Sequence, residues 1–201
     1  MRTADAPQLY LITPACAQAS TGPLLQAVMD RFPPACLRIP GAGDEAELGR
    51  LADLAREIAH ARDVAVVIDD HVRLAQRHGL DGVHLTDGAR GVRAARKELG
   101  PDAIVGAFCG TSRHEGMNAG EAGADYVAFG PAGETALGRG DPAPLELFQW
   151  WSEMIEVPVV AEGAITAALL ADLSPVSDFI ALGPEIWGTG DPLAALTALW
   201  G

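Results

Sequence analysis

Val66-Val67-Ile68-Asp69-Asp70 is a short run of β-branched residues that ends in two carboxylates. Apolar runs that end in ligand-binding residue types recur at Tyr126-Val127-Ala128-Phe129-Gly130-Pro131 and at Pro158-Val159-Val160-Ala161-Glu162-Gly163. Segments with helical spacing separate such runs along the whole chain, which indicates repeated strand–helix units. When a parallel sheet closes into a barrel, the carboxyl ends of its strands share one rim, so residues far apart in sequence meet there.

Eight such runs are present and predict strands at residues 8–13, 35–39, 64–69, 82–85, 104–108, 126–130, 158–162 and 179–183. With 201 residues in all, each unit has about 25 residues, which is compact but sufficient for a (β/α)8 barrel. An open, doubly wound sheet is the rival fold, but the chain lacks the G-x-G-x-x-G motif of its dinucleotide-binding members. We therefore predict an α/β fold, a single (β/α)8 TIM barrel that occupies residues 1–201 as one domain.

The clearest helix prediction covers residues 44–62. Asp44 and Glu47 have the spacing of a capping box there, and apolar residues follow at helical intervals. Two further helices are predicted near residues 90–99 and 144–155. The helix at residues 44–62 is expected to support the barrel and to carry no chemistry.

Composition narrows the possible partners. The formal net charge is −13, from 27 acidic against 14 basic residues, which opposes binding to nucleic acid or to an anionic membrane. The three cysteines have no metal-ligand spacing and cannot all pair, which is typical of a reducing compartment. No stretch resembles a secretory signal or a membrane span, so we expect a cytoplasmic protein. An anionic ligand would then need a local source of positive potential.

The pair Asp69-Asp70 lies at a predicted strand end, where one carboxylate can point into the barrel mouth and the other toward the next helix. A carboxylate at this rim suits Mg²⁺, which proteins bind through one or two carboxylates and substrate phosphates. The alternative is that one of the two caps the helix beginning near His71. Asp87 is a second candidate metal ligand, although Asp87-Gly88 is also a turn dipeptide. For His84 a structural, hydrogen-bonded role is favoured over catalysis.

Two glycine-containing strand ends predict a phosphate site. Gly163-Ala164 follows the seventh strand and Gly183-Pro184 follows the eighth, the positions where barrels of this kind bind phosphate. Glycine lets backbone N–H groups approach a ligand closely. An anionic Glu162 beside bound phosphate would repel it, unless its side chain points away.

Positive side chains near the predicted rim are few. Arg38 ends the second strand, Arg113 follows the fifth, and Arg139 lies in the Gly-rich segment 130–142. That segment follows the sixth strand directly, and we interpret it as a lid that closes over substrate. Because a planar guanidinium binds phosphate oxygens in pairs, these arginines are suited to neutralise a diphosphate together with a metal.

Four segments together resemble one family of small barrels. They are Leu9-Tyr10-Leu11-Ile12-Thr13, Asp81-Gly82-Val83-His84-Leu85, Gly123-Ala124-Asp125-Tyr126-Val127-Ala128-Phe129-Gly130-Pro131 and Pro158-Val159-Val160-Ala161-Glu162-Gly163-Ala164-Ile165. The chain is similar, over nearly its whole length, to the superfamily of thiamine phosphate synthases and TenI-like thiazole tautomerases. For a synthase, the resemblance implies that an aminopyrimidine diphosphate ionises with Mg²⁺ on its pyrophosphate, and that a thiazole phosphate captures the pyrimidine cation. It also implies association into a homo-oligomer.

The resemblance implies roles for particular residues. Arg38 and Arg139 would act on pyrophosphate, Asp70 and Asp87 on Mg²⁺, and Gly163 and Gly183 on thiazole phosphate. Further substrate contacts would come from Asp69, Cys109, Thr111, Thr135, Ala164 and Pro184.

The chain departs from the family pattern at charged positions. Two family lysines fall on Pro40 and Gly138, and the second metal aspartate falls on Ala89. The tautomerase alternative needs an acid–base histidine, which falls on Thr111, with His114 three residues away. A third alternative is a noncatalytic barrel that binds a thiazole or thiamine phosphate.

Overall fold

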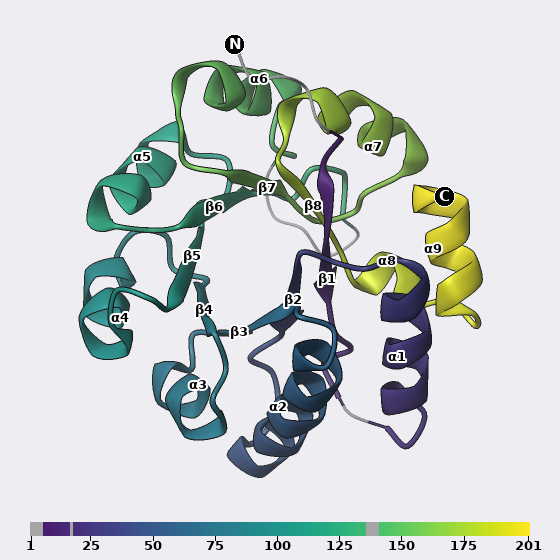
Figure 1. Ribbon diagram of the computed structural model, residues 1–201. Coiled ribbons are helices and arrows are strands. Elements are labelled where there is room, and N and C mark those ends of the chain that lie inside the picture. The colour runs from purple at the N-terminus through teal and green to yellow at the C-terminus, as the bar shows by residue number, and fades with distance from the viewer. Residues whose placement is uncertain (1–5, 17, 136–140) are drawn as a thin grey trace.

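The computed structural model describes residues 6–16, 18–135 and 141–201. Its eight parallel strands form a closed barrel in chain order, because the first strand pairs with both the second and the last. Figure 1 shows this sheet surrounded by helices. The strands are β1 (Gln8–Ile12), β2 (Cys36–Ile39), β3 (Ala65–Asp69), β4 (Gly82–Leu85), β5 (Ile104–Phe108), β6 (Tyr126–Phe129), β7 (Val159–Ala161) and β8 (Phe179–Leu182).

The fold prediction is confirmed. All eight predicted runs are strands, and the ranges for β4 and β5 agree residue for residue. The predicted ends at residues 130, 162 and 183 lie one residue beyond β6, β7 and β8. These positions belong to the loops at the rim, where the backbone leaves the sheet.

Helices follow the strands around the barrel (Figure 1). They are α1 (Thr21–Arg31), α2 (Glu45–His60), α3 (Val72–His78), α4 (Val92–Leu99), α5 (Arg113–Ala122), α6 (Leu145–Met154), α7 (Ala167–Leu173), the 3-10 turn η1 (Ser174–Val176), α8 (Pro184–Trp187) and α9 (Pro192–Trp200). The predicted capping box at α2 is present, since Asp44 accepts from the Glu47 amide and Glu47 from the Asp44 amide. The helices predicted near 90–99 and 144–155 correspond to α4 and α6.

Alternation along each strand separates two cores. In β2, Leu37 and Ile39 belong to the large core between sheet and helices, whereas Cys36 belongs to a small core inside the barrel. Side chains two positions apart share one face of a strand, so Arg38 occupies the interior position that follows Cys36. At the carboxyl rim, the last interior position of a strand can therefore hold a polar side chain, as Arg38 does in β2.

The inner core depends on a glycine in β5. Inside the barrel, the rings of Tyr10 and Tyr126 pack edge to face, with their centroids 5.7 Å apart. A Cβ added at Gly106 would lie 2.0 Å from Cζ of Tyr126. Gly106 therefore leaves the volume that the Tyr126 ring fills.

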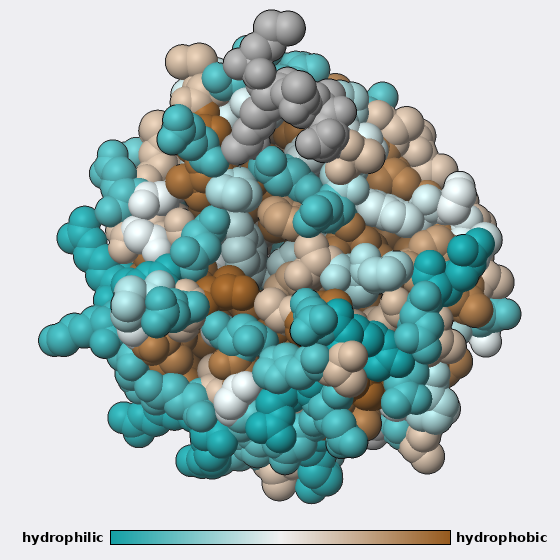
Figure 2. All heavy atoms as spheres, viewed as in Figure 1, coloured by the Kyte–Doolittle hydropathy of each residue, from teal (hydrophilic) through white to brown (hydrophobic). Residues whose placement is uncertain are grey.

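The outer surface is polar over much of the face shown in Figure 2, where hydrophilic side chains surround smaller hydrophobic areas. Within the described ranges, no helix has both the length and the apolar character needed to cross a bilayer.

Gly106→Ala should destabilise the barrel because the new methyl group overlaps the Tyr126 ring. We expect the free energy of unfolding to fall by about 1–3 kcal/mol, the usual cost of overpacking a core, as measured by urea denaturation. Gly190→Ala is the matched control, since no atom lies within 4 Å of its added Cβ. Equal stability of the two variants would contradict this account of the inner core.

Candidate active site

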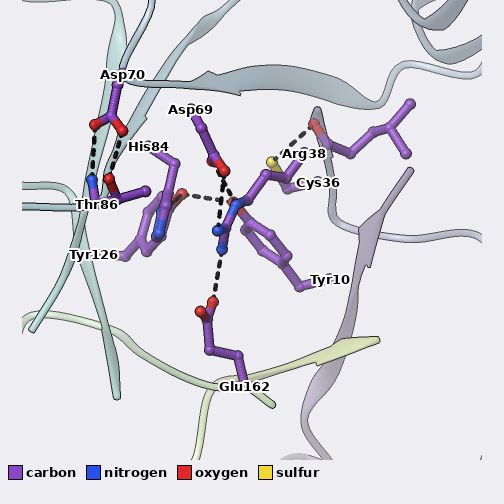
Figure 3. A network of polar contacts seen from close by, with 10 residues as sticks. Tyr10, Cys36, Arg38, Asp69, Asp70, His84, Thr86, Tyr126 and Glu162 are labelled. Carbon is purple, nitrogen blue, oxygen red and sulfur yellow. Dashed lines mark hydrogen bonds and ion pairs between the residues drawn. The ribbon is translucent and has the colours of Figure 1, made fainter. Parts of the chain in front are cut away.

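An arginine held between two carboxylates lies at the carboxyl rim inside the barrel. Arg38 Nε donates to Asp69 Oδ1 at 2.6 Å and Nη2 to Asp69 Oδ2 at 3.2 Å. Its Nη1 donates to Glu162 Oε2 at 2.7 Å. Figure 3 shows the guanidinium between the two carboxylates, which come from β3 and from the residue after β7. This contact links segments 124 residues apart in sequence.

The three groups are buried together and their charges are coupled. Burial opposes the charge of Arg38, but the carboxylates of Glu162 and Asp69 hold its pKa above the ordinary value. Burial raises the pKa of Glu162 and of Asp69, and the Arg38 guanidinium opposes that rise in both. With all three ionised, the cluster carries one net negative charge. A pyrophosphate approaching Arg38 would therefore compete with two carboxylates for the guanidinium.

A neutral polar chain runs beside this cluster. The hydroxyls of Tyr10 and Tyr126 lie 2.6 Å apart, and His84 Nδ1 lies 2.9 Å from the Tyr126 hydroxyl. Burial raises the pKa of both phenols well above the ordinary value and lowers that of His84 well below it, so all three groups are uncharged at neutral pH. His84 is thus a buried, hydrogen-bonded histidine, as the sequence favours. Its Nε2 atom has no hydrogen-bond partner among the described residues.

The two tyrosines were missed by the sequence analysis. The signal that could have found them is alternation, because Tyr126 lies two positions before Ala128 on the interior face of β6. Tyr10 lies on the same interior face of β1, two positions before Ile12.

The carboxylates of Asp69 and Asp70 have different partners. Asp69 contacts Arg38 in the barrel mouth, whereas Asp70 contacts Thr86 after β4 and not the following helix that the sequence predicts. Asp70 is exposed, has a left-handed backbone with φ +54°, and accepts from the amide and hydroxyl of Thr86. The capping alternative is wrong for both, because α3 begins at Val72 with His71 as its N-cap residue, and no side chain makes a capping hydrogen bond there. Asp69 is committed to Arg38 instead.

A hollow of about 560 Å³ lies between the loops after β4 and β5. It contains two predicted site residues, Asp87 and Cys109. Asp87 is exposed and pairs with Arg90 at 3.1 Å. Burial raises the pKa of the Cys109 thiol to about 12, so this group is a neutral thiol. The hollow is lined by Thr86, Asp87, Gly88, Ala89, Arg90, Phe108, Cys109, Gly110, Glu115 and Asn118.

The loops after β7 and β8 meet around a carboxylate of this chain. Gly163 and Ala164 have left-handed backbones, with φ +87° and +54°. The amide of Ile165 donates to Glu185 Oε1 at 3.2 Å, and the amide of Gly183 to Glu185 Oε2 at 3.0 Å. The two predicted phosphate loops are therefore adjacent, and Glu185 connects them.

The remaining predicted residues lie on the same rim or outside the described ranges. Thr111 follows β5 and is exposed, as are Thr135 in the predicted lid and Pro184 at the start of α8. Arg139 lies outside the described residues. His114 is exposed near the start of α5, and the Arg113 guanidinium lies 4.8 Å from the Trp150 ring centroid.

Glu162→Gln should change how stability depends on pH. The folded-state pKa of Glu162 is raised above its ordinary value of 4.5. Between pH 4.5 and this raised pKa, Glu162 therefore binds more protons in the folded state than in the unfolded state. This stabilising contribution is lost as pH rises through the raised pKa. The free energy of unfolding of Glu162→Gln minus that of the wild type should therefore increase with pH from 4.5 upward and then level off.

Urea denaturation at a series of pH values measures this difference. Glu153→Gln, an exposed change of equal charge on α6, should leave it flat. A difference for Glu162→Gln that decreases as pH rises would contradict the assigned electrostatics.

Comparison with known proteins finds relatives that match nearly the whole chain. A thiamine-phosphate synthase of Rhodospirillum centenum is 44% identical over 199 residues, covering 94% of each chain. One of Erythrobacter litoralis is 39% identical over 199 residues, covering 95% of this chain and 92% of that protein. The solved structure of thiamine phosphate pyrophosphorylase from Pyrococcus furiosus has the same fold, with a TM-score of 0.78, 22% identity and full coverage of both chains.

A family model described as thiamine monophosphate synthase matches residues 9–183. The match runs from the second residue of β1 to the residue after β8, and so includes every strand of the barrel. By this match and by these relatives, the chain belongs to the thiamine monophosphate synthase family.

Proposed function

We propose that this protein joins an aminopyrimidine diphosphate to a thiazole phosphate and releases pyrophosphate, forming thiamine phosphate. Family membership over residues 9–183 is the observation that carries the proposal, because that range contains all the strand ends of the rim. Curated relatives named thiamine-phosphate synthase, up to 44% identical over most of the chain, support it.

The rim can supply positioning and charge stabilisation. In the proposed reaction the bond between the pyrimidine methylene and the diphosphate breaks, and the thiazole nitrogen forms the new bond to that carbon. Such a reaction depends mainly on holding two substrates in line and on stabilising separated charge. The cluster of Asp69, Arg38 and Glu162 lies at the mouth. When both carboxylates are ionised, its net negative charge favours a cationic pyrimidine over a neutral one.

The proposed substrate contacts come from strand ends and from the loops that follow them. Arg38 and Arg139 are proposed for pyrophosphate, and the loops of Gly163, Ala164, Gly183 and Pro184 for thiazole phosphate. Asp69, Cys109, Thr111 and Thr135 complete the proposed substrate contacts.

Mg²⁺ is the proposed cofactor. The described residues hold no group of three or more His, Cys, Asp or Glu side chains placed to bind a metal. A Mg²⁺ ion bound mainly by substrate phosphates needs only one or two carboxylates. Asp70 fits this requirement, because it is exposed and Thr86 fixes its carboxylate, and Asp87 on the next loop is the proposed second ligand. When bound, the ion would neutralise charge on the leaving pyrophosphate.

Two wider proposals accompany the reaction. We propose a cytoplasmic location, which is supported by three free cysteines, Cys16, Cys36 and Cys109. We also propose that the protein forms a homo-oligomer, as the resemblance implies.

Asp70→Asn should reduce kcat/KM for thiamine phosphate formation by about 100-fold or more, the scale expected when a group that stabilises developing charge is lost. Asparagine suits this position because it tolerates the left-handed backbone. The assay combines purified protein, both phosphorylated substrates and Mg²⁺. Asp102→Asn is the matched control, since this exposed residue precedes β5 at the opposite end of the barrel.

Two other outcomes would overturn the proposal. Aromatisation of the thiazole carboxylate without thiamine phosphate formation, lost in His114→Ala, would identify a thiazole tautomerase. Binding of the thiazole phosphate with no turnover in either assay would identify a noncatalytic barrel.

A further inference from the structure

Glu185 occupies the amide groups that a bound phosphate would be expected to use. One oxygen accepts from the Gly183 amide at 3.0 Å, and the other accepts from the Ile165 amide at 3.2 Å. These amides belong to the loops after β8 and β7, which are the predicted phosphate loops. The carboxylate is thus an internal anion in the place predicted for an external one.

Helix capping alone does not explain this contact. Glu185 is the second residue of α8, and its bond to Gly183 is local. The bond to Ile165 spans 20 residues and connects a different loop. A carboxylate that bridges two loops through backbone amides has the geometry of a bound anion.

The surrounding charges do not hold Glu185 in place. Burial raises the pKa of Glu162, and Glu185 is among the charges that raise it further. The two glutamates therefore repel each other across the rim. The guanidinium of Arg38 is engaged by Asp69 and Glu162. The Glu185 carboxylate accepts hydrogen bonds from the two amides instead.

We propose that Glu185 limits the affinity of this site by competing with the substrate phosphate for the amides of Gly183 and Ile165. This inference deepens the proposed function and rests on it only in taking a phosphate as the ligand. A phosphate binds when the half-buried Glu185 side chain rotates away and exposes both amides. The cost of displacing the carboxylate lowers the affinity for the phosphate. When the carboxylate returns to the amides, it favours release of a phosphorylated product.

The test measures binding of inorganic phosphate, the ligand group alone, at constant ionic strength. Calorimetric titration of Glu185→Gln and Glu185→Ala should show a Kd about tenfold lower than that of the wild type, because the competing charge is gone. A tenfold change corresponds to about 1.4 kcal/mol. The exposed control Glu153→Gln should bind phosphate as the wild type does.

Thermal unfolding of the same variants supplies a second readout. Without phosphate, Glu185→Ala should unfold at a lower temperature, because two amides lose their acceptor. Added phosphate should raise its Tm more than that of the wild type. Unchanged or weaker phosphate binding in both folded variants would overturn the proposal, as would absence of phosphate binding in all of them.

This experiment is separable from the synthase assay. Inorganic phosphate binding needs neither the pyrimidine substrate nor turnover. A tightened Kd in a protein that forms no thiamine phosphate would support the role of Glu185 and refute the proposed reaction. Turnover by the wild type, together with an unchanged phosphate Kd in the Glu185 variants, would support the proposed reaction and refute the role of Glu185.

Discussion

Pairing of β8 with β1 closes the sheet, and this closure determines which side chains can meet. In a closed barrel every strand has an inner and an outer face, so each interior position is committed to a small common volume. Tyr10, Val67 and Tyr126 fill that volume, and Arg38 and Asp69 occupy the next interior positions toward the rim. Without the pairing of β1 with β8, the sheet would be open, and nothing would bring the segment after β7 close to β2 and β3 around the Arg38 guanidinium.

Closure also brings charged side chains together in the barrel mouth, where little water reaches them. Two carboxylates and one guanidinium lie at the mouth, and removal from water costs several kcal/mol per ion unless partners replace the solvent. The three donor nitrogens of Arg38 that contact Asp69 and Glu162 supply those partners. The site is therefore an acidic one that contains an arginine. Such a site suits a cationic group better than an anion.

Much of the fold was predictable from local patterns. Short β-branched runs, turn residues and the Asp44–Glu47 capping box depend on neighbouring residues, and these elements were predicted with boundaries within about two residues of the observed ones. The placement of the site at one rim was also predictable, because parallel strands bring their carboxyl ends together. The pairing of Arg38 was not, since its partners come from positions 31 and 124 residues away. A lone arginine at a strand end looks like an anion receptor until its neighbours are known.

The same distinction applies to the loops after β7 and β8. By itself the sequence determined that Gly163 and Gly183 follow strands seven and eight, because glycine placement is a local property of the chain. It also determined the barrel, through eight regularly spaced runs. Only the tertiary structure decided that Glu185 bridges these loops and that Glu162 turns toward Arg38, because a side chain's partner depends on which strands become neighbours when the sheet closes.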